Sequence, residues 1–399
     1  MRTLDLLVGG ILVQIINVLS LFKMGRRSGL PERRAVANIL FIKFFGGGSL
    51  ILSTPMARGL KKRYPNARIS LLTFRENREL AGRLPVYDRI ITLRNDAFGG
   101  FFADLVRNLF RIWRTRPDLV VDGEFFSNFT NVLSWMTFAK FQVGFYQRQV
   151  ARGKTYSHKV SLNNHKHIAH IFFSLAAAVG ARYEDAELTE LDLKPPDAGE
   201  IASAFAKLGL PSGAPVVVVN PNASPLSYLR RWPAGHFVAL VSEMVAIHPD
   251  FYYVFVGSGN EADYVESIAA RIPSPAIKNS AGKLTMGELL ALVYKSGLVI
   301  TNDSLPVHIA SGYKKNVAAF FGPETPRLYG PLNGNALTFF EDIHCSPCLL
   351  TFANKLGEKC GDNVCLGKIT PRRVLEEIER RFFSQGTLAG DRGASGAQP

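Results

Sequence analysis

Residues 296–311 read SGLVITNDSLPVHIAS, an apolar run that stops at Asn302-Asp303 and is followed by a predicted helix carrying His308. Strand, polar turn and helix in this order present polar groups at the carboxyl end of a parallel sheet. Ligands bind at that edge, close to helix N-termini that favour phosphate. The pattern returns at 316–326, where the apolar run NVAAFF ends in the loop GPETP. The two segments together predict a ligand-binding edge.

Both halves of the chain alternate apolar strands with helical patterns. A helical pattern from Leu50 to Tyr64, for example, follows the glycine loop 46–48. The predicted strands are 38–44, 68–74, 89–93, 119–122, 215–220, 251–257, 298–301 and 316–321. Such alternation predicts parallel sheets with right-handed crossovers. The predicted fold class is therefore α/β, with two Rossmann-like domains facing each other across a cleft.

The predicted domain boundaries follow changes in composition. Residues 1–34 are expected to form a membrane-associating amphipathic helix with a basic linker, and residues 184–196 resemble a linker between domains. We expect an N-terminal domain over 35–190, a C-terminal domain over 196–384, and a disordered Gly/Ala/Ser-rich tail over 385–399.

Positive charge is concentrated in the first half of the chain. The 399 residues carry a net charge of +14, and residues 1–160 hold 26 Lys/Arg against 10 Asp/Glu. Such a surface attracts anionic lipid, phosphorylated glycan or nucleic acid. Because RNA-binding signatures are missing, we expect a lipid or glycan partner and no nucleic acid.

The segment from Leu6 to Phe22 is apolar except for three polar residues close to one helical face, Gln14, Asn17 and Ser20. We interpret it as an in-plane helix on the cytoplasmic leaflet, so that the protein is peripheral on the inner face of the cytoplasmic membrane. A single membrane span and an ordinary packed helix are the alternatives. The segment has no evident small-residue cleavage site, so we do not interpret it as a secretory signal. A basic helical face with Arg107, Arg111 and Arg114 could also rest on anionic membrane or simply be solvated.

All four cysteines lie in one short segment, with the spacing C-x2-C-x11-C-x4-C: Cys345, Cys348, Cys360 and Cys365. In a reducing compartment, two cysteine pairs suit a tetrahedral structural Zn²⁺. An iron–sulfur cluster is the alternative. We expect no cofactor for catalysis itself.

Three loops of the second half follow predicted strands and should line one edge of its sheet. They are 220–224 with the nearby Arg230, 257–261, and 302–308. Together they offer backbone amides, hydroxyls, a guanidinium and a carboxylate, which suit a nucleoside diphosphate. A Walker lysine motif is missing.

Several of these segments resemble glycosyltransferase family 9, the ADP-heptose:lipopolysaccharide heptosyltransferases. The matching segments are Ile39–Lys43 with the glycine loop and Thr54-Pro55, 63–67, the Arg231-Trp232-Pro233 loop, and 302–310 with Phe321-Gly322-Pro323. The resemblance implies a GT-B fold and metal-independent inverting transfer. It also implies a nucleotide-sugar donor, with ADP-heptose the first expectation, and an anionic lipid-linked glycan as acceptor.

By position in that family, Asp303, Ser304 and His308 correspond to donor-site residues, Arg230 to a phosphate-binding cation, and Glu261 lies near a nucleotide-contacting acid. Asn222, Ser224 and Gly257 complete the expected donor site. His308 as a satisfied helix histidine and Arg230 as a surface charge are the alternatives.

The chain departs from the family at the first glycine loop, where many members carry a catalytic Asp after the last glycine. Here Gly47-Gly48 is followed by Ser49, which we expect to be a helix N-cap or an acceptor contact. A hydroxyl cannot take the acceptor's proton without its own base. Glu124, or less favourably Asp122, is therefore the predicted base, and a structural acid or helix cap is the alternative.

Two other functions stay open at this point. A non-catalytic relative that binds nucleotide or glycan and scaffolds a membrane assembly would explain Ser49. An epimerase-type enzyme on a similar fold would act without a separate acceptor.

Overall fold

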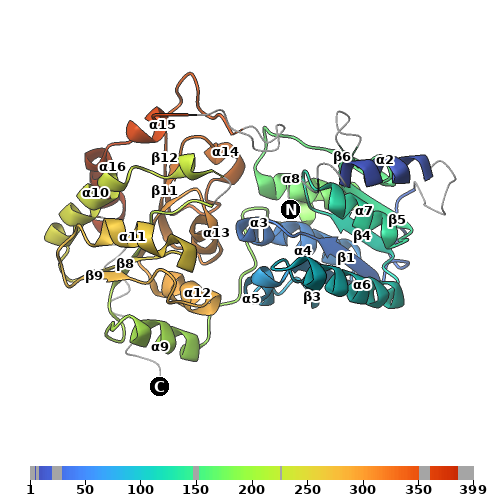
Figure 1. Ribbon diagram of the computed structural model, residues 1–399, viewed down its shortest axis with the longest axis horizontal. Helices are drawn as coiled ribbons and strands as arrows, with labels where there is room; N and C mark the ends of the chain where they lie inside the picture. Colours follow the sequence, from blue (N-terminus) through green and yellow to red (C-terminus); the bar gives the residue numbers. More distant parts are fainter. Residues whose placement is uncertain are drawn as a thin grey trace. The chain divides into compact units, whose positions relative to one another are not determined.

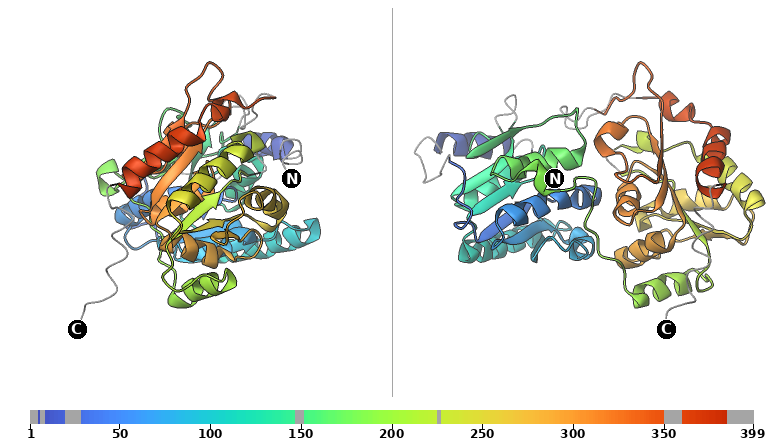
Figure 2. Two further views of the ribbon diagram at one scale, coloured as in Figure 1. Left: turned by 90° about the vertical axis from the view of Figure 1, so that its left-hand side faces the viewer. Right: turned by 180° about the vertical axis from the view of Figure 1, so that it is seen from behind.

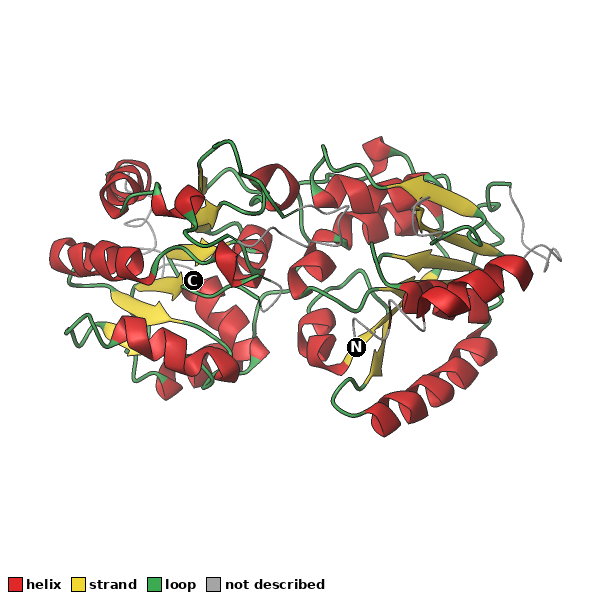
Figure 3. Cartoon of the chain, turned by 45° about the horizontal axis from the view of Figure 1, so that its top comes forward, coloured by secondary structure: helices red, strands yellow, loops and turns green. Residues whose placement is uncertain are grey.

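The computed structural model describes residues 5, 9–19, 29–146, 152–224, 227–349 and 360–384. The chain divides into two compact units, Met1–Lys194 and Pro195–Pro399. Each unit contains one sheet flanked by helices, as the colouring by secondary structure makes plain (Figure 3). The predicted tail, 385–399, and parts of the predicted N-terminal helix lie outside the described residues.

The N-terminal unit contains a six-stranded parallel sheet in the order β3-β2-β1-β4-β5-β6 (Figure 1). Its strands are β1 Asn38–Ile42, β2 Arg68–Phe74, β3 Arg89–Leu93, β4 Leu119–Asp122, β5 Phe141–Tyr146 and β6 His158–Ser161. The chain proceeds outward from β1 to β3 and then returns to the other side of β1 at β4. The loops after β1 and β4 therefore meet at a topological switch point, where open α/β sheets bind ligands.

Seven α-helices are described in this unit: α2 Gly10–Leu19, α3 Gly47–Leu52, α4 Thr54–Arg63, α5 Arg78–Gly82, α6 Phe98–Thr115, α7 Asn128–Met136 and α8 Ile168–Ala177. Helices α6 and α7 bury Leu109, Ile112 and Leu133 in a shared core with the strand residues Leu40 and Ile42. The views from the side and from behind show these helices layered on the sheet (Figure 2).

The C-terminal unit repeats the same strand order. Its parallel sheet runs β12-β11-β10-β7-β8-β9, with the switch point between β7 and β10. The strands are β7 Val216–Asn220, β8 Tyr252–Phe255, β9 Ile277–Asn279, β10 Leu298–Asn302, β11 Asn316–Phe321 and β12 Ala336–Phe340. The α-helices are α9 Ala198–Lys207, α10 Ala234–Ile247, α11 Ala262–Ala269, α12 Met286–Lys295, α13 Leu305–Gly312, α14 Pro326–Tyr329, α15 Val364–Gly367 and α16 Pro371–Ile378.

The predicted fold class is confirmed, with two α/β units of the Rossmann-like kind and eight predicted strands present. Strands β5, β6, β9 and β12 were not predicted. The single helix expected over 50–64 is instead α3 and α4, separated at Ser53. Pro55 lacks the N–H that would continue the helix, and the Thr54 hydroxyl donates to the Ile51 carbonyl oxygen at 2.8 Å instead.

Helix α2 is packed on α7 through one face and exposed on the other. Val13 and Ile16 are buried, whereas Ile11 and Val18 are 63% and 60% exposed. Among the described residues, no helix has both the length and the apolar character needed to cross a membrane.

Candidate functional site

At the switch point of the C-terminal unit, side chains join the loops after β7 and β10. The amide Nδ2 of Asn220 donates to Thr301 Oγ1 at 2.9 Å and to Ser304 Oγ at 2.7 Å. The Nδ2 of Asn302 donates to the carbonyl oxygen of Asn222 at 3.3 Å. Two of the three predicted donor loops therefore lie together.

Arg230 reaches the same place from the short helical turn Tyr228–Arg230. Its Nη1 donates to both the carbonyl oxygen and the carboxylate Oδ2 of Asp303, each at 3.0 Å, and its Nη2 donates to Ser224 Oγ at 2.5 Å. Arg230 and Asp303 are only 8% and 4% exposed, so the arginine is no surface charge. Its guanidinium is held at the strand end, where it can neutralise a bound anion.

The third predicted loop, after β8, packs directly against the first. A Cβ on Gly257 would lie 2.8 Å from Asn222 Nδ2, so only glycine leaves room for this amide. Asn222 Nδ2 in turn donates to the Val256 carbonyl oxygen at 2.8 Å. Glu261 closes a capping box, because its Oε2 accepts from both the amide and the hydroxyl of Ser258.

Helix α13 begins directly after Ser304, which is its N-cap residue. Its first amide groups therefore face the loops just described, and the helix dipole favours negative charge there. His308 lies one turn into this helix and is buried. The structure thus brings together Asn222, Ser224, Arg230, Asp303 and Ser304, with Gly257 beside them.

In the N-terminal unit, Glu124 lies at the other switch point and is tied to the loop after β1. Its Oε1 accepts from Lys43 Nζ at 2.9 Å and from the amides of Phe44 and Phe45 at 2.6 and 2.9 Å. The carboxylate and the lysine are both buried. Oε2 of Glu124 accepts no hydrogen bond from the part of the chain that the structure describes, which leaves it for a ligand.

Asp122 is engaged in a buried network of its own. Its Oδ2 accepts from Arg152 Nη2 at 3.0 Å and from the Tyr156 hydroxyl at 2.5 Å, and its Oδ1 accepts from the Glu124 amide at 2.9 Å. Burial raises the pKa of Asp122, although the Arg152 charge opposes this shift. Asp122 is fully buried. Because its Oδ1 accepts from the Glu124 amide, this contact holds the backbone at Glu124.

The glycine loop corrects one expectation. Ser49 is not a helix N-cap, because α3 begins at Gly47 and its N-cap residue is Gly46, with φ at 82°. Glycine adopts this positive-φ conformation without steric cost, so the helix starts three residues earlier than a Ser49 N-cap would place it. Ser49 lies in the first turn of α3, next to the buried Gly48, and is partly exposed.

The four cysteines form no disulfide bonds in the part of the chain that the structure describes. Burial, with smaller effects from the nearby thiols of Cys348, Cys345 and Cys360, raises the pKa of Cys365 to about 11. Within the described ranges, which include all four cysteines, no group of three or more His, Cys, Asp or Glu residues is placed to hold a metal ion.

Three residues important to these sites were not among the predicted site residues: Lys43, Arg152 and Asn220. Asn220 ends the apolar strand β7 and Lys43 directly follows the apolar strand β1, and a polar residue at the end of an apolar run was the available signal. Arg152 contacts Asp122 across 30 residues of sequence. No local pattern marks such a partner.

Comparison with known proteins identifies the family of this chain. The model of glycosyltransferase family 9 (heptosyltransferase) matches residues 123–355, more than half of the chain. Lipopolysaccharide heptosyltransferase 3 of Escherichia coli is 25% identical over 312 residues, which cover 73% of this chain and 86% of that protein. Lipooligosaccharide heptosyltransferase 2 of Campylobacter jejuni is 29% identical over 174 residues, covering 43% and 52%.

Solved structures share the fold. The ADP-heptose lipopolysaccharide heptosyltransferase II of E. coli has a TM-score of 0.70 at 21% identity, covering 87% of this chain and 99% of that one. The iron-containing dodecameric glycosyltransferase TibC of enterotoxigenic E. coli has a TM-score of 0.53 at 16% identity, covering 88% and 77%. With the family model matching across the junction of the two units, this chain belongs to glycosyltransferase family 9, the heptosyltransferases.

Proposed function

We propose that this glycosyltransferase moves heptose from ADP-heptose to a lipopolysaccharide-type glycan, with inversion at the anomeric carbon. The observation that carries the proposal is the buried Arg230–Asp303 pair at the N-terminus of α13. A cation beside helix amides suits a diphosphate, and an adjacent carboxylate suits sugar hydroxyls. The named relatives that share the family act on lipopolysaccharide or lipooligosaccharide.

The proposed chemistry is a direct displacement. Glu124 Oε2 takes the proton of the acceptor hydroxyl while the hydroxyl oxygen forms a bond to the anomeric carbon. The bond from that carbon to the diphosphate oxygen breaks, and its electron pair leaves with ADP. Arg230 and the first amides of α13 stabilise the negative charge that develops on the leaving diphosphate.

The remaining predicted residues have supporting roles in this proposal. Asp303 holds Arg230 through Oδ2 and leaves Oδ1 for a sugar hydroxyl. Asn222, Ser224, Gly257, Glu261, Ser304 and His308 form the walls of the donor site. Gly47, Gly48 and Ser49 line the acceptor loop beside Glu124, and Asp122 positions the Glu124 backbone.

Substitution of Glu124 by Gln tests the assignment of the base. We expect transfer to fall about 10²–10⁴-fold while ADP binding by the C-terminal unit is unchanged. Because the Gln leaves Lys43 buried without its counter-charge, stability should fall by on the order of 3 kcal/mol.

The double variant Lys43→Met with Glu124→Gln separates these effects, because it removes both charges together. It should regain much of the lost stability and still fail to transfer. Unchanged turnover in the single variant would reject Glu124 as the base. Inactivity of the wild type toward every nucleotide sugar, with ADP still bound, would favour the non-catalytic scaffold instead.

We also propose that the enzyme works at the cytoplasmic membrane surface, where a lipid-linked acceptor lies. Two observations support this location, namely the exposed apolar face of α2 and the excess of positive charge in the first 160 residues. Flotation of the full chain with anionic vesicles, compared with a variant carrying Ile15→Ser and Val18→Ser, tests the contribution of α2. Equal flotation of the two would exclude it.

The four cysteines are proposed to bind one structural Zn²⁺, for which their sulfurs must approach one another more closely than in the structure. Their concentration in one segment supports the proposal. Elemental analysis of purified protein should give one zinc per chain, and none in a Cys360→Ser variant. The structural relative TibC is named as iron-containing, so iron in place of zinc would correct the metal. No metal at all would reject the site.

A further inference from the structure

Helix α6 of the N-terminal unit has apolar side chains on the side away from the sheet. Phe102, Val106 and Phe110 follow one another at four-residue intervals and are 57%, 38% and 56% exposed. Four-residue spacing places them in one row along the helix. The core is contacted by the adjoining face of the helix, where Leu109 and Ile112 are buried.

The row continues into a cluster of aromatic rings at the ends of α6 and α7. The ring centroid of Trp113 lies 5.4 Å from that of Phe110 and 6.3 Å from that of Phe138, and Trp135 lies 6.0 Å from Phe138. Two of the three tryptophans of the chain are therefore in this cluster. We call the row and the cluster together the aromatic surface: Phe102, Val106, Phe110, Trp113, Trp135 and Phe138.

Phe138 occupies a position that folding alone would not give to phenylalanine. Its φ is 54°, in the left-handed region that glycine and asparagine adopt most easily. The side chain is 59% exposed, so burial does not compensate for the unfavourable backbone. A large apolar side chain at this position therefore indicates a role outside the unit's own core.

Cations accompany the aromatic surface. Arg107, Arg111 and Arg114 form the neighbouring row on α6, and Lys140 follows Phe138 closely; all four are exposed. Arg107 pairs with Asp104. Within the described residues, Arg114 and Lys140 form no ion pair, so their charges remain available to a partner.

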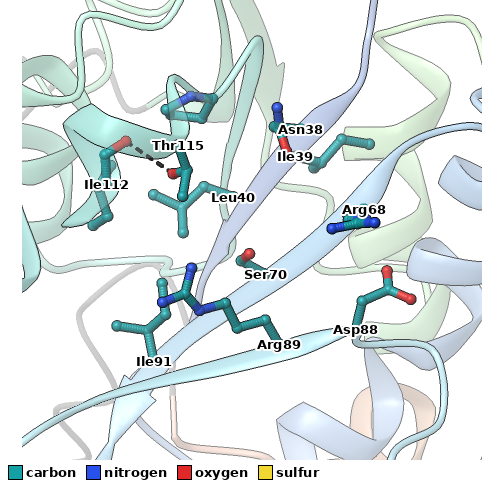
Figure 4. A pocket seen from close by; sticks show the side chains of 11 residues that line it. Asn38, Ile39, Leu40, Arg68, Ser70, Asp88, Arg89, Ile91, Ile112 and Thr115 are labelled. Atoms are coloured by element: carbon teal, nitrogen blue, oxygen red, sulfur yellow. Dashed lines mark hydrogen bonds between the residues drawn. The ribbon is translucent and has the colours of Figure 1, made fainter.

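Further positive charge lies on the other flank of the last turn of α6. A cavity of about 250 Å³ is bounded there by Ile112 and Thr115 of the helix and by Arg68 and Arg89 at the beginnings of two strands (Figure 4). Asp88 also lines the cavity, and its carboxylate Oδ1 is paired with Lys61 Nζ at 2.9 Å. The surroundings of the α6 C-terminus are thus basic on both sides.

We infer that the aromatic surface docks on an anionic phospholipid bilayer, with its rings at the boundary of headgroups and acyl chains and the flanking cations on lipid phosphates. Tryptophan and phenylalanine beside arginine and lysine are the composition that membrane interfaces favour. A second copy of the chain is disfavoured as the occupant, because it would bring two basic surfaces together. The inference rests on the proposed lipid-linked acceptor only for its purpose, since vesicle binding is measured without any transfer.

The test is partition of the full chain onto phosphatidylglycerol-containing vesicles, measured by co-sedimentation. Phe138→Asn is the decisive variant, because asparagine suits the left-handed backbone and the variant should melt no lower than the wild type. We expect Phe110→Ser with Phe138→Asn to lower the partition constant about tenfold or more. Arg114→Gln should lower it about fivefold, and only on anionic vesicles.

Matched controls come from the C-terminal unit. Ile247→Asn, at a position 51% exposed, and Arg271→Gln should leave the partition constant unchanged. Equal loss in these controls, or no loss in the aromatic variants, would overturn the inference. A dimer in solution that dissociates in the aromatic variants would also overturn the inference, because a second copy of the chain would then occupy the aromatic surface. Transfer to a short water-soluble acceptor should be the same in wild type and variants, so failure of the proposed function would appear as no transfer by any of them.

Discussion

At the scale of single residues, two carboxylates two positions apart have different environments. Asp122 is enclosed by Arg152 and Tyr156, whereas Glu124 faces Lys43 and two backbone amides with one oxygen left over. A proton acceptor needs a free oxygen within reach of the substrate. This difference favours Glu124 as the proposed base, with Asp122 as its proposed support.

Replacement of Asp122 by Asn should therefore affect stability first. The fully buried guanidinium of Arg152 loses its counter-charge, which we expect to cost about 3–5 kcal/mol in urea unfolding. Tyr156→Phe removes only one hydrogen bond to the same carboxylate and should cost about 1 kcal/mol. If Asp122→Asn were as stable as wild type but inactive, Asp122 would be the base.

Substitution of Arg230 tests the proposed donor site in the same way. A lysine cannot reach Asp303 and Ser224 together as the forked guanidinium does. Arg230→Lys should weaken ADP binding about tenfold or more in calorimetry, because a charge-assisted contact is lost. Arg271→Gln, an exposed arginine of the same unit, provides the control, and equal ADP affinity in Arg230→Lys would contradict the role.

Residue-scale prediction from sequence placed neighbouring residues together where one loop carries its own signal, and their roles stay predictions. Asp303, Ser304 and Arg230 were named from their places after predicted strands, and the structure brings them together. Lys43 and Arg152 were not predicted, because the carboxylate that each of them contacts lies far away in the sequence. Ser49 was expected to be a helix N-cap or an acceptor contact, and the cap is wrong because the sequence does not reveal that Gly46 takes a positive φ.

At the scale of elements, an ion pair ties α9 to α12 in the C-terminal unit. Glu288 accepts from Lys207, from the Ser203 hydroxyl and from the Thr285 amide. These contacts, that with Lys207 above all, hold the pKa of Glu288 at about 2, below its usual 4.5. The ionised carboxylate therefore stabilises the folded chain above about pH 4.5.

Acid should remove this stabilisation as the pH falls from about 5 toward 2, since the unfolded chain binds the proton more readily than the folded one. Melting temperature measured against pH should fall less steeply in Glu288→Gln than in wild type over that window. Glu243→Gln, an exposed acid on α10, should follow the wild-type curve. Identical slopes for Glu288→Gln and wild type would show that the tie does not contribute.

Strand prediction was limited by strand position. The eight predicted strands include both central pairs, which are apolar because they are covered on two faces. Strand β6 alternates between partly buried and exposed residues, and β9 has three residues; both lie at sheet edges. Strand β5 contains Gly144, where a Cβ would collide with the Tyr156 ring. Close packing therefore favours glycine there, and the strand lacks one of the apolar side chains on which strand prediction relies.

At the scale of the whole molecule, the two units share one strand order but divide the proposed work. The proposed donor residues lie in the C-terminal unit and the proposed base in the N-terminal unit. Residues 195–384 expressed alone should therefore bind ADP with the affinity of the full chain. In a thermal-shift assay, ADP at about 100 times its dissociation constant should add about 2.7 kcal/mol of stability. Stabilisation of residues 1–194 by ADP would contradict this division.

Trp232 joins the donor loops to the segment that carries Cys360 and Cys365. Its amide donates to Asn302 Oδ1 at 2.9 Å and its indole to the Ile369 carbonyl oxygen at 2.8 Å, while Asn363 Nδ2 donates to the Arg231 carbonyl oxygen at 3.1 Å. Thermodynamic linkage makes such a connection reciprocal. Any ligand of the thiols that shifts this segment changes nucleotide affinity by the same factor by which nucleotide changes affinity for that ligand.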